Sequence, residues 1–304
     1  MSWREIKTAT RGLFDSLNSD DEELKFNWDK FALVCQQYSK GNGGVTRHLE
    51  ETLQKSPQKK DSMIILDHGC GAGLKCLYLM AIGYKRVYGV NVNAKVDRLN
   101  HIVNRCGFGS EKRFQQIDGG KLPFKNDFFD FIYSQQVLEH VKDEHIECFY
   151  KEENRVGKAG ALIYHELPHN FQPYDSHSRL FFAHWFPSFL QPFVYGLFKS
   201  IASSQNCFSK GTDYATRFNG DFLSLRSPLF HYRMARKHFG NVEDLTQERL
   251  NVLLQFSDYD PEGLPKLRRF FTILFSLPII GRLLLYIFKY AFMINTLSVN
   301  HKSK

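Results

Sequence analysis

Apolar runs and amphipathic segments alternate along the middle of the chain. Residues 63–66, Met-Ile-Ile-Leu, form an uninterrupted apolar run, which is typical of a parallel strand covered on both faces. Further apolar runs and helical spacings follow in alternation. They predict strands at 86–92, 114–117, 129–134 and 161–166, and helices at 74–82, 94–105 and 144–155. This order indicates βαβ units, so we predict an α/β fold with a doubly wound parallel sheet and helices on both faces.

The alternation covers only part of the chain, and composition divides the rest. We predict a helical lead-in at 1–60, the core at 61–168, an aromatic-rich insertion or lid at 169–228, and a C-terminal completion of the core at 229–304. The insertion is rich in aromatic residues, His, Pro and Ser. We expect it to lie over an acceptor site at the carboxyl ends of the strands, where such folds bind ligands. The last segment should contribute an edge strand at 292–300.

Phenylalanine and basic residues are both abundant. Phe accounts for 28 of 304 residues, and the formal net charge of +8 favours an anionic partner. Residues 180–198 and 270–281 are largely apolar, but prolines or short length make neither a clean membrane-spanning helix. Either could be a peripheral segment on the inner face of a membrane, and equally a helix packed on the core or a dimer contact. The oligomeric state is left open.

Cysteine and histidine usage bears on the compartment and on metal binding. The six cysteines form no CxxC pair and the N-terminus is polar with early acidic residues, so we predict a cytoplasmic protein with reduced thiols. Four nearby histidines match no compact metal motif. We therefore predict no metal site and expect some of the four to line an acceptor pocket; they are His165, His169, His177 and His184.

A glycine-rich turn follows the first predicted strand. It reads Asp67-His68-Gly69-Cys70-Gly71-Ala72-Gly73 and leads into a helix. Glycines let the backbone approach a ligand closely, and the free N–H groups at the start of a helix attract a carboxylate or phosphate. The dinucleotide fingerprint GxGxxG would need a third glycine at 74 or 76, where Leu74 and Cys76 stand. A nicotinamide oxidoreductase is therefore disfavoured.

The turn and four later patches resemble the class I S-adenosylmethionine-dependent methyltransferases of the ubiquinone or glycan-lipid type. The patches are Gly89-Val90-Asn91-Val92, Ile117-Asp118-Gly119-Gly120-Lys121-Leu122-Pro123-Phe124, Phe129 to Val141 and Asn154 to Gly160. The resemblance implies a seven-stranded Rossmann-like sheet and S-adenosyl-L-methionine as cofactor. It also implies cofactor contacts from Asp67, Gly69, Gly71, Gly73, Asn91, Asp118, Gly119 and Gln135. Asn91 stands where the family has an acidic residue for the ribose; an amide can still bond a hydroxyl, without the added strength of a charge.

The expected reaction is methyl transfer to an amphipathic small-molecule, lipid or glycan acceptor, most simply at oxygen. A hydroxyl acceptor must lose a proton, and His140 is the candidate base, although a structural histidine fits the same position. Two alternatives stay open. Asn91 favours an inactive interaction or membrane module, and the charge favours RNA methylation. Nucleic acid is not expected, because Ser134-Gln135-Gln136-Val137 stands where a base-gripping Asn-Pro-Pro-Tyr-like tetrapeptide would be.

Overall fold

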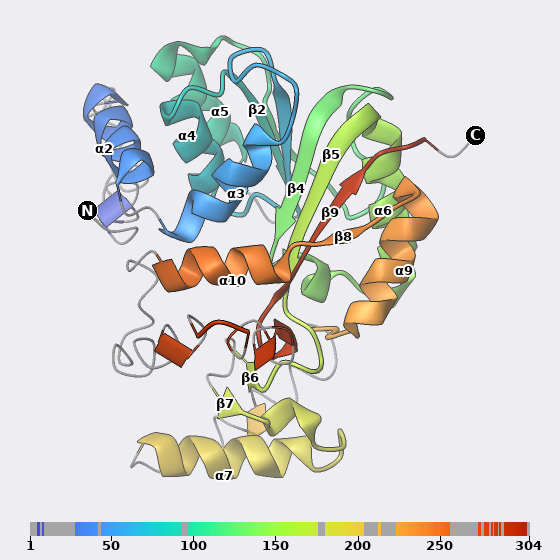
Figure 1. The fold of residues 1–304 in the computed structure, drawn as a ribbon. Helices are drawn as coiled ribbons and strands as arrows, with labels where there is room; N and C mark the ends of the chain where they lie inside the picture. Colours follow the sequence, from blue (N-terminus) through green and yellow to red (C-terminus); the bar gives the residue numbers. More distant parts are fainter. Residues whose placement is uncertain are drawn as a thin grey trace.

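A computed structural model gives the fold of this chain (Figure 1). The structure describes residues 5–6, 8, 28–41, 44–92, 96–175, 180–203, 212–213, 223–255, 273–274, 277–279, 281, 283–284, 286 and 289–302. Statements below refer to these residues. Of the sequence predictions, His177 and half of the apolar stretch at 270–281 fall outside them.

The described core contains a seven-stranded sheet in the order β3-β2-β1-β4-β5-β9-β8. Its strands are β1 (Ile64–His68), β2 (Arg86–Asn91), β3 (Phe114–Gln116), β4 (Phe129–Gln135), β5 (Gly157–Leu167), β8 (Glu243–Asp244) and β9 (Ile294–Val299). The first five strands pair in parallel, and β9 is antiparallel to both of its neighbours. Chain order reverses at β1, as it does in doubly wound sheets. The predicted fold class is confirmed.

Helices cover both faces of the sheet (Figure 1). The described helices are α2 (Trp28–Lys40), α3 (Gly44–Gln54), α4 (Leu74–Ala81), α5 (Val96–Val103), α6 (Asp143–Val156), α7 (Gln191–Ser203), α9 (Pro228–Phe239) and α10 (Thr246–Gln255). Of these, α7 lies below the sheet and covers neither face. One apolar core joins α2 to α5 with one side of the strands, and a second joins α6 and α9 with the other side. All five residues of β1 are buried, as expected for a strand covered on both faces.

The last strand corrects a prediction. We expected an edge strand at 292–300, but β9 lies between β5 and β8. The structure buries the polar residues of β9 with hydrogen-bond partners. The Tyr164 hydroxyl donates to Asn295 Oδ1 at 2.6 Å, and Ser298 Oγ donates to the Asn241 carbonyl at 2.9 Å. Because buried polar groups are tolerated when they are hydrogen-bonded, a polar strand can occupy an interior position.

The insertion after β5 lies below the carboxyl ends of the parallel strands (Figure 1). Its described part holds the short antiparallel pair β6 (Tyr174–Asp175) and β7 (Leu180–Phe181), followed by α7. The end of the segment packs on the core, because Arg226 donates to the carbonyls of Leu138 and Val141 at 2.9 and 2.6 Å. Among the described helices, none combines the length and the apolar character needed to cross a bilayer.

Candidate active site

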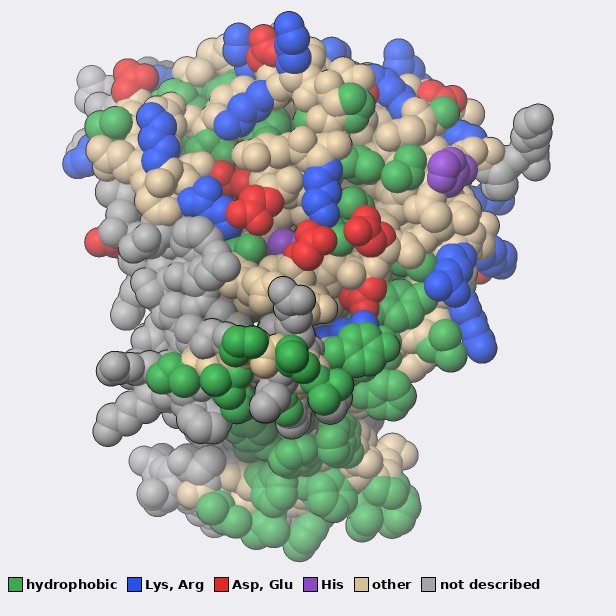
Figure 2. Space-filling model, in the orientation of Figure 1, with side chains coloured by type: hydrophobic (Ala, Val, Ile, Leu, Met, Phe, Trp, Pro, Cys, Tyr) green, Lys and Arg blue, Asp and Glu red, His purple; other side chains and the backbone are tan. Residues whose placement is uncertain are grey.

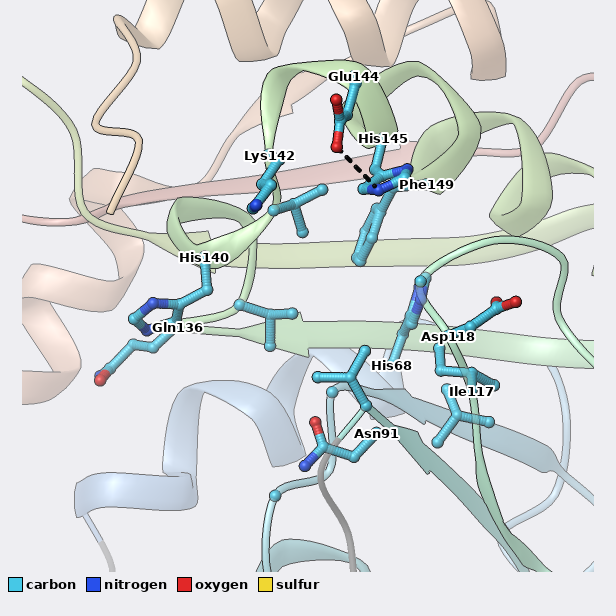
Figure 3. A pocket seen from close by; sticks show the side chains of 17 residues that line it. His68, Asn91, Ile117, Asp118, Gln136, His140, Lys142, Glu144, His145 and Phe149 are labelled. Atoms are coloured by element: carbon cyan, nitrogen blue, oxygen red, sulfur yellow. Dashed lines mark ion pairs between the residues drawn. The ribbon is translucent and has the colours of Figure 1, made fainter. Parts of the chain in front are cut away.

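A cavity of about 640 Å³ opens at the carboxyl ends of β1, β2 and β4 (Figure 3). This volume is in the range of small-molecule sites, and the position is the one at which doubly wound sheets bind ligands. The lining comes from three strand ends, the loop after β3 and the start of α6. It consists of His68, Gly69, Gly71, Val90, Asn91, Val92, Ile117, Asp118, Gly119, Gln136, Val137, His140, Val141, Lys142, Glu144, His145 and Phe149. The described insertion residues contribute nothing to this wall, so the lid over an acceptor site remains a prediction.

The glycine turn forms one wall of the cavity. Gly69 and Gly71 line it, with φ of 102° and 52°. The N–H groups of Gly69 and Cys70 both donate to the Val90 carbonyl at 2.9 Å, which ties the turn to β2. A Cβ on Gly69 would meet Val137 at 2.3 Å, whereas a Cβ on Gly71 would meet nothing within 4 Å. The space over Gly71 is therefore left open for a ligand.

Gly73 and Asp67 support the turn from behind. Gly73 is the N-cap of α4, and a Cβ there would lie 2.7 Å from Leu99. Asp67 is buried on the α4 side, where it accepts hydrogen bonds from Tyr133 Oη at 2.8 Å and Cys76 Sγ at 3.4 Å. Burial raises the pKa of the Asp67 carboxyl, partly offset by Lys75. Neither Asp67 nor Gly73 lines the cavity, so both support the glycine turn without facing the space that it encloses.

Asn91, Asp118 and Gly119 face the cavity from β2 and from the loop after β3 (Figure 3). The side-chain amide of Asn91 makes no hydrogen bond to any described residue. The main-chain carbonyl of Asn91 accepts from the Ile117 N–H at 3.1 Å. Asp118 Oδ1 accepts from the Gly120 N–H at 2.9 Å. This bond shapes the turn and leaves the second carboxylate oxygen for a ligand. The resemblance implies that Asn91 contacts the ribose and Asp118 the adenine amino group, and both residues line the same cavity.

At the end of β4 the structure separates two neighbouring glutamines. Gln135 points away from the cavity: its Oε1 accepts from Lys75 Nζ at 2.6 Å and its Nε2 donates to Glu166 at 3.2 Å. Gln136, with a φ of 57°, lines the cavity instead. The sequence prediction named Gln135; the positive φ at Gln136 rotates the chain, which no local sequence pattern indicated. His140 lines the cavity as predicted for a base, with Nε2 3.9 Å from Glu139 Oε1.

Gln135 belongs to a buried polar cluster on the α3 and α10 side of the sheet. Arg249 donates to both oxygens of Glu166, from Nε at 2.6 Å and from Nη2 at 2.9 Å. Burial by itself would raise the pKa of Glu166, but Arg249 holds it down at about 2. The Tyr164 hydroxyl lies 3.0 Å from His48 Nδ1, and burial lowers the pKa of His48 to about 4. This cluster fixes the ends of β4 and β5 behind the cavity.

The histidines expected in an acceptor pocket are otherwise engaged. His165 is buried with Nε2 2.8 Å from Glu153 Oε2. His169 is buried with Nε2 2.9 Å from the Phe292 carbonyl, and burial lowers its pKa to about 4. Neither lines the cavity, and the expectation that some of the four histidines line an acceptor pocket stays a prediction. Sequence reasoning also missed His68, which does line it. The sequence could have indicated this, because His68 follows Asp67 in the same strand and successive side chains of a strand point to opposite faces of the sheet.

Comparison with known proteins agrees with this geometry. Residues 66–165 match the family described as methyltransferase domain. They form a class I S-adenosylmethionine-dependent methyltransferase domain. The predicted family is confirmed, and S-adenosylmethionine is the cofactor of such a domain. The match ends inside β5, so it covers the cavity and none of the insertion.

The relatives of this methyltransferase domain differ in what they methylate. A sterol 24-C-methyltransferase of Gibberella zeae is 30% identical over 143 residues, which is 46% of this chain and 37% of that protein. An ajmaline N-methyltransferase of Rauvolfia serpentina is 30% identical over 35% of this chain and 36% of its own length. A solved geranyl diphosphate C-methyltransferase of Streptomyces coelicolor is 12% identical, with a TM-score of 0.47, over 93% of this chain and 84% of that one. The chain spans about two fifths of the curated relatives it matches first.

The cavity of the methyltransferase domain fits the cofactor in size and chemistry. Gly71 leaves open space beside backbone N–H groups, which suits a carboxylate tail. The Asn91 amide and the Asp118 carboxylate lie in the same cavity and can bond ribose hydroxyls and an adenine amino group. Apolar residues between these polar groups, such as Ile117 and Val137, supply the packing surface for a purine.

Proposed function

We propose that this protein transfers a methyl group from S-adenosylmethionine to an oxygen atom of an amphipathic, lipid- or glycan-linked acceptor. The observation that carries the proposal is that Gly71, Asn91 and Asp118, from separate strand ends, line one cavity of suitable volume. A sterol is named as the substrate of one relative, which is in keeping with an apolar acceptor. The relatives support the choice of oxygen as the methylated atom less than they support an apolar acceptor, because those named above act at carbon and nitrogen.

In this reaction the protein has to bind the cofactor and the acceptor and to align them. The bound cofactor supplies an already activated methyl group on a sulfonium sulfur, so no strong nucleophile has to be generated for it. The glycine turn holds the amino-acid tail, and Asn91 and Asp118 hold the adenosyl group. His140 accepts the proton of an acceptor hydroxyl, since a neutral imidazole near pH 7 suits this step. The apolar walls would exclude water from the bound cofactor and restrict how the acceptor lies beside it.

A large exposed apolar surface supports an acceptor held at a membrane. We define this aromatic surface by its exposed side chains: Phe171, Phe181, Phe182, Trp185, Phe186, Phe189, Leu190, Phe193, Leu197 and Ile201. Figure 2 shows a large apolar area at the bottom of the molecule, where Figure 1 places α7. No Asp or Glu occurs from 180 to 203, and the whole chain carries a charge of +8. Trp and Phe with no opposing acidic charge suit the interface of an anionic bilayer.

Removing two side chains of the aromatic surface should weaken membrane binding. Phe189 and Phe193 are 78% and 57% exposed. The double variant F189S/F193S should bind vesicles of phosphatidylcholine and phosphatidylglycerol about tenfold more weakly than the wild-type protein in a sedimentation assay. The matched control L33S/L229S removes two comparably exposed leucines from α2 and α9 and should bind as the wild type does. Equal binding by all three proteins would contradict membrane binding by this surface and leave it as a contact for another protein.

The cofactor assignment is tested by calorimetry with S-adenosylhomocysteine, the demethylated product of the cofactor. The wild-type protein should bind it, and Asn91→Asp should bind about fivefold more tightly, because a carboxylate makes stronger hydrogen bonds to ribose hydroxyls than an amide does. Gln115→Glu places the same charge on the neighbouring β3, outside the cavity lining, and should leave the dissociation constant unchanged. No binding by either the wild type or N91D would favour the inactive module instead.

The acceptor is best sought without assuming its identity. Lipids and glycans extracted from cells with and without the gene should differ by species that are lighter by one methylene mass when the gene is absent. The same extracts, incubated with the purified protein and cofactor carrying a labelled methyl group, should take up label. Label found in protein or RNA and absent from lipids and glycans would contradict the proposed acceptor class.

A further inference from the structure

His68 belongs to a buried chain of three ionisable side chains behind the cavity. His68 Nδ1 lies 3.0 Å from Glu153 Oε1, and His165 Nε2 lies 2.8 Å from Glu153 Oε2. His68 and His165 come from the ends of β1 and β5, and Glu153 comes from α6. Glu153 has no exposed surface, and the two histidine side chains expose 6% and 2%. Residues far apart in the sequence thus share one carboxylate.

The carboxylate determines which ring nitrogen of His68 carries a proton. Burial by itself would raise the pKa of Glu153, but His165 and then His68 hold it below the usual value, so the carboxylate is ionised. An ionised carboxylate only accepts hydrogen bonds, so His68 must donate from Nδ1. In the neutral ring, Nε2 then carries a lone pair and acts as an acceptor.

Nε2 is the ring nitrogen of His68 that the Glu153 bond leaves available, and the residue lines the cavity. The ring stacks on Phe149, with centroids 3.8 Å apart and planes 5° apart, and both residues line the cavity (Figure 3). Within the described part of the chain, Glu153 is the one hydrogen-bond partner of His68. Stacking and the Glu153 bond leave the ring little freedom. Figure 3 shows it between Asn91 and Asp118, the two groups assigned to the adenosyl part.

We propose that His68 binds the adenosyl group of the cofactor through Nε2, and that Glu153 is the positioning residue that keeps this nitrogen an acceptor. The inference rests on the proposed function. It also explains how the site can do without an acidic residue at Asn91. A hydrogen-bond acceptor of fixed orientation at His68 would replace part of the hydrogen bonding that a carboxylate at position 91 gives to the adenosyl group. The donor on the ligand is a ribose hydroxyl or the adenine amino group.

The test replaces, one at a time, the two histidines that share the Glu153 carboxylate. His68→Phe keeps an aromatic ring on Phe149 and removes Nε2 from the cavity. His165→Phe removes the other imidazole from Glu153 and leaves the cavity lining unchanged. Both variants should unfold at lower temperature than the wild type. Binding of S-adenosylhomocysteine should weaken about tenfold in H68F and less than twofold in H165F.

A second readout is independent of affinity. Nitrogen-15 spectra of the wild-type protein should show His68 with a protonated Nδ1 and an unprotonated Nε2, and the Nε2 resonance should shift when S-adenosylhomocysteine is added. S-inosylhomocysteine, which lacks the adenine amino group, distinguishes the two donors. If the H68F penalty disappears with this analogue, the amino group is the donor; if the penalty persists, the ribose is.

The outcomes separate this inference from the proposed function. If the wild-type protein binds S-adenosylhomocysteine and H68F binds it equally well, His68 is a structural residue and the inference is wrong. Equal weakening in H68F and H165F, with no shift of the Nε2 resonance, would also make the chain purely structural. If the wild-type protein does not bind at all, the cofactor proposal itself fails.

Discussion

Replacing Arg249 with methionine should lower the free energy of unfolding by about 3–5 kcal/mol, measured by chemical denaturation. Arg249 donates to both oxygens of Glu166, and both side chains are buried. Methionine fills similar space but leaves the carboxylate without its charged partner in a medium that solvates charge poorly. The cost is that of an unpaired buried charge, which is larger than the net value of the pair.

The same helix offers a matched control for Arg249. Glu248 is the adjacent residue, and its ion pair with Lys55, at 2.9 Å, is exposed. Glu248→Gln should change the free energy of unfolding by less than about 1 kcal/mol, because water solvates both charges well. The double variant E166Q/R249M removes the orphaned charge and should recover part of the loss in R249M. If R249M proved no less stable than E248Q, the buried pair would not be what fixes the end of β5.

Replacing Gly71 with alanine should weaken binding of S-adenosylhomocysteine on the order of 100-fold, with a loss of stability no larger than the unfavourable φ causes. The new Cβ would meet no protein atom within 4 Å, so the fold has room for it. That space is the part of the cavity assigned to the amino-acid tail, and a methyl group there displaces the ligand from the backbone N–H groups. A steric cost of about 1–3 kcal/mol corresponds to a factor of about five to about 150 in the dissociation constant.

Gly160→Ala is the control for backbone strain at Gly71. Gly160 also has a positive φ, 79°, and open space around its Cβ position, but it lies outside the cavity lining. Both alanine variants should lose about 1–3 kcal/mol of stability to the unfavourable φ, and only G71A should lose binding by calorimetry. Equal affinities in G71A and the wild-type protein would mean that the ligand does not occupy the space over the turn.

Sequence alone predicted those features of the fold that depend on neighbouring residues. The apolar run at 63–66 indicated a buried parallel strand because a strand covered on both faces has no polar side. The glycine spacing after Asp67 predicted the turn, since positive φ and close approach both require glycine, and the structure gives Gly69, Gly71 and Gly73 positive φ. Asn91, Asp118 and His140 were placed at strand ends or just after them, and strand ends of a parallel sheet meet at one edge.

The tertiary structure decided what depends on contacts between distant segments. Whether β9 is an edge or an interior strand depends on β8 and β5 on its two sides, and β8 comes from a distant segment. Which glutamine faces the cavity depends on a positive φ at Gln136. The role of His68 requires Glu153, 85 residues later, which periodicity within one segment cannot reveal. Local patterns encode which face of an element is buried, and only packing determines which side chains meet there.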